Sequence, residues 1–157
     1  EFEFLHPRTH RGWNENNASC VLRLRADGRE VLLTGDIERD AERVLLARRN
    51  LGPANVVIAP HHGSRSSSGV ELVSALRPDY VVFPVGYRNR WGFPHPEVRA
   101  RWADAGACAV ETSASGSVSF ELRADQPLQP VFAAASWRRP WPVRQAAEGV
   151  CDSGVPL

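Results

Sequence analysis

The chain lacks several things that would point to a particular class of protein. It has 157 residues, no methionine and no lysine, so its 19 basic residues are all arginines. We interpret the arginines as coding bias and the missing methionine as the sign of a piece of a longer protein. The formal net charge is +1, which argues against a strong field that attracts nucleic acid. The apolar runs are far shorter than the roughly 20 residues that span a bilayer, and the start does not resemble a signal peptide. We therefore expect a soluble piece with no transmembrane segment.

Cysteine is also scarce. The three cysteines are far apart and form no Cys-x-x-Cys pair, which excludes a zinc knuckle and gives no disulfide framework. Cys20 and Cys108 lie in apolar, strand-like contexts. We predict that both are small core residues.

The pattern of apolar residues predicts alternating strands and helices. An Asp-Gly turn at 27–28 joins two strand-like runs, 19–25 and 30–34, into a hairpin. Helices are predicted after Asp36, near 70–76, and from Pro96 to about Gly106. Apolar strands are predicted at 56–59 and 79–85. This alternation predicts an α/β domain with a mixed sheet.

The two ends of the chain are predicted differently. Residues 107–112 and 117–122 are predicted to form a closing hairpin, so that hairpins lie at both ends of the sheet. From Asp125 onward prolines interrupt every period. We therefore place a domain at 1–124 and a Pro-rich tail, extended or partly disordered, at 125–157.

Two strand ends carry the candidate site. Asp36 follows the apolar run 31–34, and His61 and His62 follow the run 56–59. Open α/β sheets place ligand sites beyond the carboxyl ends of their strands. A carboxylate with imidazoles suits a divalent transition metal. As alternatives, Asp36 could cap a helix and the histidines could be solvated loop residues.

Other polar residues are candidates for binding substrate. Ser64 follows the histidines and is interpreted as a capping or phosphate-binding hydroxyl. Asn17 and Ser19 could hold substrate or serve in an ordinary turn. Asn89 and His95 lie in a long polar loop, where His95 is either a third imidazole at the site or a helix cap.

For the aromatic and arginine residues around the candidate site, we prefer a structural role to a role in binding. Trp91 and Trp102 are predicted to be packing residues and not platforms for nucleobases. Five arginines flank the candidate site and could bind phosphates, although surface arginines are usually just solvated: Arg8, Arg11, Arg65, Arg88 and Arg90.

Five segments, in this order, carry a resemblance to a known family: Asn17-Ala-Ser19, Leu33-Thr-Gly-Asp36, Ala59-Pro-His-His-Gly-Ser64, Pro78-Asp-Tyr80 and Asn89-Arg-Trp-Gly-Phe-Pro-His-Pro96. Together they resemble the carboxy-terminal domain of the ComEC family of DNA-internalisation competence proteins, from about Leu5 to Leu122. The resemblance implies a metallo-β-lactamase fold, which is an αββα sandwich. It also implies a metal-dependent nuclease that cleaves phosphodiesters in DNA during uptake.

The resemblance also implies roles for the site residues. Asp36 and His62 would be ligands of a two-metal centre with zinc or manganese, and His61 would be a catalytic proton donor or a neighbour of the ligands. Asn17, Ser19, Ser64, Asn89 and His95 would contact substrate. The partners would be single-stranded DNA and a membrane channel, with the domain on the periplasmic side of the bacterial inner membrane.

One departure from the family pattern is large. The His-x-His-x-Asp-His type motif of such domains is missing, so the chain corresponds to the second half of the domain. We expect weak metal binding by this chain on its own and leave its activity open. Apolar sheet surface left without the other half would favour self-association. The alternatives are hydrolysis of another phosphodiester, such as a choline-phosphate ester, and a non-catalytic module that binds nucleic acid.

Overall fold

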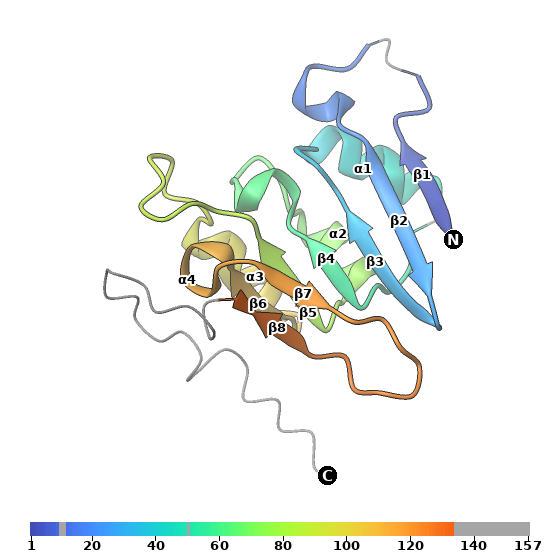
Figure 1. The fold of residues 1–157 in the computed structure, drawn as a ribbon. Coiled ribbons are helices and arrows are strands. Elements are labelled where there is room, and N and C mark those ends of the chain that lie inside the picture. Colours follow the sequence, from blue (N-terminus) through green and yellow to red (C-terminus); the bar gives the residue numbers. More distant parts are fainter. Residues whose placement is uncertain (10–11, 50, 134–157) are drawn as a thin grey trace.

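The main feature of the fold is one six-stranded sheet with strand order β1-β2-β3-β4-β5-β6 (Figure 1). The structure is a computed structural model, and it describes residues 1–9, 12–49 and 51–133. Neighbours in the sheet are also neighbours in the sequence. The predicted α/β class with a mixed sheet is confirmed.

The first half of the sheet is antiparallel. It contains β1 (Phe2–His6), β2 (Val21–Ala26) and β3 (Arg29–Leu33). Between β2 and β3, Asp27 and Gly28 both have positive φ, 47° and 72°, as a tight two-residue hairpin turn requires. The hairpin predicted from the Asp-Gly pair is confirmed.

The second half is parallel. β4 (Val56–Ile58), β5 (Tyr80–Phe83) and β6 (Cys108–Glu111) all run in the direction of β3. Their crossover helices are, in order, α1 (Arg39–Ala47), α2 (Val70–Leu76) and α3 (Pro96–Asp104). Pro96 occupies the first turn of α3, where its missing N–H costs nothing. All three helices were predicted from the sequence.

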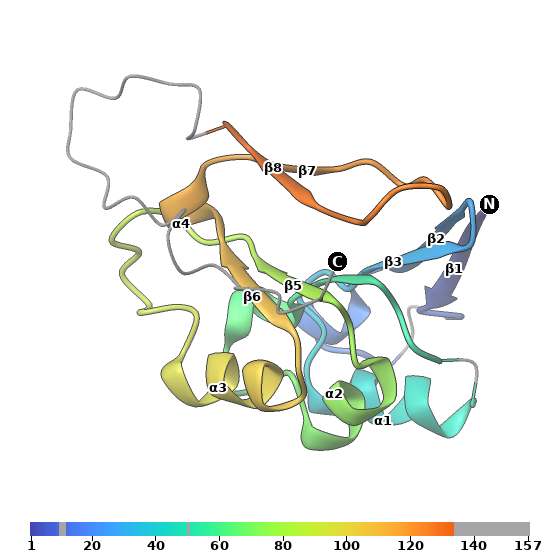
Figure 2. The same ribbon diagram turned by 90° about the horizontal axis from the view of Figure 1, so that it is seen from below.

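Short elements complete the fold. They are η1 (Asn16–Ala18), η2 (Pro60–Gly63), α4 (Thr112–Ser115), β7 (Val118–Phe120) and β8 (Pro130–Phe132). Helices α1 to α3 cover one face of the sheet, and the β7–β8 ribbon lies over the other (Figure 2). The described chain therefore has three layers.

Each face of the sheet has its own core, because side chains alternate along a strand. Val57 and Val81 pack against the helices, together with the fully buried Trp102 of α3. Val56 and Val82 point to the opposite face, where they pack with Phe120 and Phe132 of the ribbon. The unbroken valine-rich runs arise because both faces of these strands are covered.

The closing hairpin was predicted wrongly. β6 pairs in parallel with β5, and β7 pairs antiparallel with β8, so 107–112 and 117–122 are not partners. Residues 112–115 form α4 and turn the chain onto the other face of the sheet. β8 and the buried Leu128 belong to the segment assigned to the Pro-rich tail, whereas 134–157 lies outside the described residues.

The cysteine prediction was wrong for Cys20, which precedes β2 and is exposed. Cys108 of β6 is half-buried, packs against the core on the ribbon face of the sheet and is disulfide-bonded.

We also searched for membrane spans. Within the described part of the chain, none of the helices combines the length and apolar character needed to cross a bilayer.

Candidate functional site

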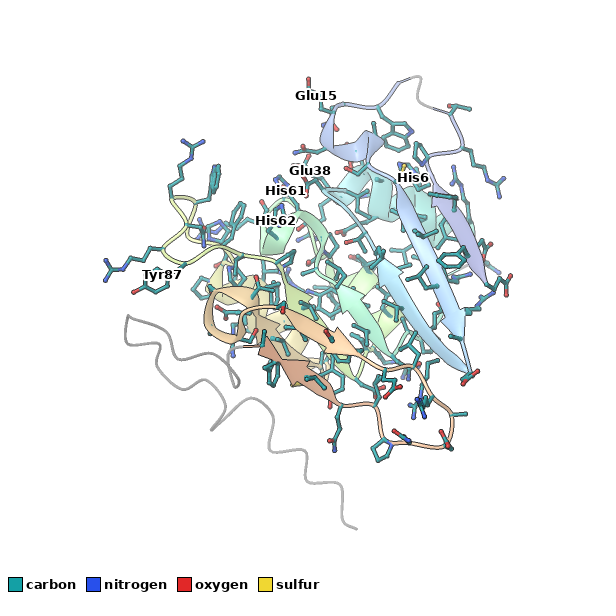
Figure 3. The ribbon with its side chains drawn as sticks, viewed as in Figure 1. His6, Glu15, Glu38, His61, His62 and Tyr87 are labelled. Atoms are coloured by element: carbon teal, nitrogen blue, oxygen red, sulfur yellow. The ribbon has the colours of Figure 1, made fainter. Side chains whose placement is uncertain are left out.

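The carboxyl ends of β3, β4 and β5 meet at one edge of the sheet, and the predicted residues gather there. The His62 Nε2 lies 3.2 Å from Asp36 Oδ1. Both side chains are a little under half exposed, so they remain accessible to a ligand. His61 and His62 lie beside Glu38 at this edge, whereas His6 is farther away (Figure 3).

The orientation of His62 determines which of its nitrogens faces Asp36. His62 Nδ1 lies 3.0 Å from the carbonyl oxygen of Pro84. A carbonyl oxygen only accepts, so Nδ1 carries the proton in this bond. In the neutral ring, Nε2 is then a bare lone pair facing a carboxylate oxygen. Two acceptors so close together repel each other unless a proton or a metal ion lies between them.

A second carboxylate–imidazole pair lies beside the first. Glu38 Oε1 is 3.3 Å from His61 Nδ1 and accepts hydrogen bonds from Ser66 Oγ (2.8 Å) and Asn16 Nδ2 (3.3 Å). Burial by itself would raise the pKa of the Glu38 carboxyl. The hydrogen bonds from Ser66 and Asn16 and the charge of His61 outweigh burial and lower this pKa below its usual value. Glu38 is therefore held as a carboxylate against the imidazole.

The backbone that carries the histidines is unusual. His61 and His62 have φ of 46° and 54°, a region that residues with a Cβ rarely adopt. Two such residues in succession indicate stored backbone strain of the kind that accumulates at functional sites. The His61 N–H donates to the carbonyl of Gly35 at 3.0 Å and joins this turn to the loop of Asp36.

Gly63 completes the turn and is required there for two reasons. Its φ is 86°, and a Cβ at this position would lie 2.6 Å from the Pro94 Cβ and 2.9 Å from the Phe83 ring. The absence of a side chain lets the 86–95 loop approach the histidines. The His95 N–H donates to the Gly63 carbonyl at 3.0 Å and fixes that approach.

Asn17 and Ser19 accept hydrogen bonds from backbone N–H groups of the loop that contains Asp36 and of the start of α1. The Asp36 N–H donates to Ser19 Oγ at 3.1 Å. The Glu38 and Ala41 N–H groups donate to Oδ1 of the buried Asn17 at 2.9 and 3.2 Å. Asn17 thus supplies the cap of α1 from another element. Glu38 occupies the N-cap position, so Asp36 is not the cap of this helix.

The loop that follows the histidines, residues 64–69, is held in place by a side chain of α1. The Ser68 and Gly69 N–H groups, which immediately precede α2, donate to the buried Glu42 at 2.5 and 2.8 Å. Burial raises the pKa of Glu42, against the opposing effect of these N–H groups and of Arg39 and Arg101. Ser64, predicted to bind substrate, is buried and its hydroxyl lies 3.0 Å from the Ser66 hydroxyl.

The 86–95 loop forms the rest of the site. Asn89 closes it through two hydrogen bonds to the Phe93 backbone, of 2.7 and 2.9 Å, and His95 packs edge-on against the Phe93 ring. A cleft of about 340 Å³ opens between the strand ends and this loop. Its lining includes Asp36, His61, His62, Asn89, Trp91 and Phe93.

The donors fit a divalent ion, but they are too few to complete a site. Among the described residues, no group of three or more His, Cys, Asp or Glu is placed to hold a metal ion. The Asp36 carboxylate and the His62 imidazole nevertheless have the spacing of two ligands on one ion bound at about 2.0–2.2 Å.

Two residues of the site escaped the sequence analysis. Glu38 was not named as a candidate site residue, although its position two residues after Asp36 was a usable signal. Trp91, predicted to pack, is 59% exposed and lines the cleft, so that prediction was wrong; the same prediction for Trp102 is confirmed.

The fold and the site define an α/β domain with a carboxylate–imidazole site at its strand ends. Comparison with known proteins shows which proteins the chain is similar to. No family model matches the chain. It is 36% identical over 124 residues to Competence protein ComA of Neisseria gonorrhoeae, covering 78% of this chain and 18% of that protein. It is 34% identical over 125 residues to Recombination protein 2 of Haemophilus influenzae (80% and 16%) and 29% over 126 residues to ComE operon protein 3 of Bacillus subtilis (78% and 16%).

These relatives support a competence-protein family for the chain. The chain spans about a sixth of the length of the curated relatives that it matches.

Proposed function

We propose that this chain forms part of a metal-dependent phosphodiesterase of the metallo-β-lactamase fold that cleaves DNA during uptake. The observation that carries the proposal is the His62 Nε2 facing Asp36 Oδ1 at 3.2 Å, with the opposite ring nitrogen committed to the Pro84 carbonyl. This pair of acceptors fits a cation between them. Ligating histidines commonly donate their other ring N–H in this way.

Asp36 and His62 would hold the ion. The remaining ligands would come from sequence outside the described residues, since the site has two donors here and a catalytic zinc site has at least three. A bound divalent metal, zinc or manganese, would stabilise charge on the phosphate and lower the pKa of a water molecule. Two ions in a complete domain would act on both the attacking and the leaving oxygen.

His61 has the geometry of a proton donor. Its Nδ1 faces the Glu38 carboxylate at 3.3 Å, and this contact orients the ring. A proton on its other nitrogen would be available to the leaving oxygen of the substrate. Asn17 and Ser19 act in this proposal by positioning Asp36 and Glu38 through the backbone.

DNA is the proposed substrate because the relatives are competence proteins. Near-neutral charge does not oppose this proposal when a channel delivers the strand to the site. The membrane channel and the periplasmic placement of the domain belong to the same proposal.

The test measures cleavage of single-stranded DNA with manganese or zinc by the native protein with all the sequence that its gene encodes. Asp36→Asn should lower the rate at least about 100-fold, since loss of a partner that only supports a ligand already costs 10–100-fold. Asp40→Asn, an exposed acidic control on α1, should leave the rate unchanged. Equal rates for the two variants would overturn the proposal. Cleavage of choline-phosphate esters but not DNA would overturn the assignment of substrate.

A further inference from the structure

We propose that the 86–95 loop is a stacking platform for the bases of single-stranded DNA, with Trp91 as the residue that contacts a base. The inference takes its ligand from the proposed function, but it concerns binding and does not require cleavage. The loop joins β5 to α3 and stands out from the strand ends, with Tyr87 far from the sheet (Figure 3).

The aromatic rings form a continuous series from solvent to the site. Trp91 stacks on Phe93 with ring centroids 6.3 Å apart and planes 17° apart. The Phe93 ring in turn contacts the His61 ring edge-on at 5.8 Å. A base stacked on Trp91 would therefore lie one ring beyond the residues that face the cleft.

Exposure separates this series from core packing. Trp91, the outer ring of the series, is 59% exposed, whereas Phe93 is half-buried; Tyr87, elsewhere on the same loop, is 65% exposed. Exposed apolar residues scattered singly need no explanation, but two exposed rings on one short loop beside a cleft form the kind of cluster that marks a ligand surface. Base stacking on such rings tolerates any sequence, since every base has a π-face.

Charge on the loop complements a phosphate backbone. Residues 86–96 contain two arginines and a histidine and no acidic residue. The Arg90 guanidinium lies 4.4 Å from the Trp91 ring centroid, and that of Arg88 lies 5.3 Å from the ring of Tyr87. Each guanidinium lies over a ring face, so a base that stacks on that face of Trp91 would displace Arg90 toward the phosphates of the strand.

The test is a binding titration without cleavage. A labelled thymidine oligonucleotide of about 12 nucleotides, within the range that single-strand sites occupy, is titrated with the full chain in EDTA and followed by anisotropy. Trp91→Ala should weaken binding about tenfold, and Trp91→Phe, which keeps a ring, should restore most of it. Phe2→Ala is the matched control, because Phe2 is 77% exposed on β1 at the edge of the sheet; it should bind like the unmodified chain.

A second oligonucleotide isolates stacking from charge. An abasic strand of equal length offers the same phosphates without bases, so Trp91→Ala should bind it as the unmodified chain does. Three results would overturn the platform. Trp91→Ala could lose the same affinity for both strands, Trp91→Ala and Phe2→Ala could lose equal affinity for the thymidine strand, or the unmodified chain could fail to bind. A uridine strand that shows the same dependence on Trp91 would extend the platform to single strands in general and supports stacking.

The result separates the two proposals. A Trp91-dependent affinity in EDTA supports the platform even if the native protein cleaves nothing. If the native protein cleaves DNA in a metal-dependent way but Trp91→Ala does not change the affinity, the proposed function is supported and the platform is overturned.

Discussion

At the scale of single residues, the site depends on backbone conformations that most residues avoid. His61 and His62 adopt positive φ, and Gly63 follows with φ of 86° against Pro94 and Phe83. The hydrogen bonds of this turn to Gly35 and His95 hold it in place. The histidines are thereby aimed at Asp36 and Glu38 before any ligand arrives.

Replacement of Gly63 by alanine should be costly. The Cβ would collide with the Phe83 ring and Pro94, and the positive φ would be strained, so we expect a loss of more than about 1 kcal/mol in the free energy of unfolding. Urea denaturation measures this loss. Gly86→Ala is the control, because a Cβ there meets no atom within 4 Å. Equal stabilities of the two variants would contradict this account of the turn.

Glu38 should make the stability of the protein sensitive to acid. Its folded pKa is lowered, so its contribution is present above its ordinary pKa of 4.5 and is lost as the pH falls through the folded value. Denaturation midpoints measured from about pH 6 to about pH 3 should fall less steeply in Glu38→Gln than in the unmodified chain. Asp40→Asn, with an exposed side chain paired to Arg43, serves as the comparison. A Glu38→Gln curve parallel to that of the unmodified chain would argue against the network around Glu38.

At the scale of elements, three loops are held against one another by side chains from neighbouring elements. η1 supports the start of α1 through Asn17, and α1 holds the loop before α2 through Glu42. His6 of β1 supports η1 in turn, since its Nε2 lies 2.7 Å from the Asn17 carbonyl oxygen. The site is therefore built by cross-connections and not by any one motif.

Asn17→Ala should loosen this arrangement. It removes the acceptor for two backbone N–H groups, and one of them would be left buried, so we expect a loss of about 1–3 kcal/mol. Amide hydrogen exchange should also show faster exchange at Glu38 and Ala41. Asn16→Ala removes one longer bond to Glu38 and should cost less. The account fails if Asn16→Ala is the more damaging change.

At the scale of the whole molecule, periodicity and turn chemistry predicted the mixed sheet and its crossover helices. Asp36, His61 and His62 could be found because strand ends are marked by abrupt changes from apolar to polar residues. The pairing of β7 with β8 could not be predicted, because two three-residue strands separated by a Pro-containing connection carry little periodic signal. Glu38 and Trp91 escaped for a related reason: their roles follow from the direction in which a loop side chain points, which spacing does not encode.

The central claim is that Asp36 and His62 share a cation, and paramagnetic NMR of the full chain tests it most directly. Substoichiometric Mn²⁺ should broaden the ring signals of His62 far more than those of the buried His6, and Asp36→Asn should abolish the difference while Asp40→Asn keeps it. Equal broadening of His62 and His6, or a selective effect that survives in Asp36→Asn, would contradict the claim.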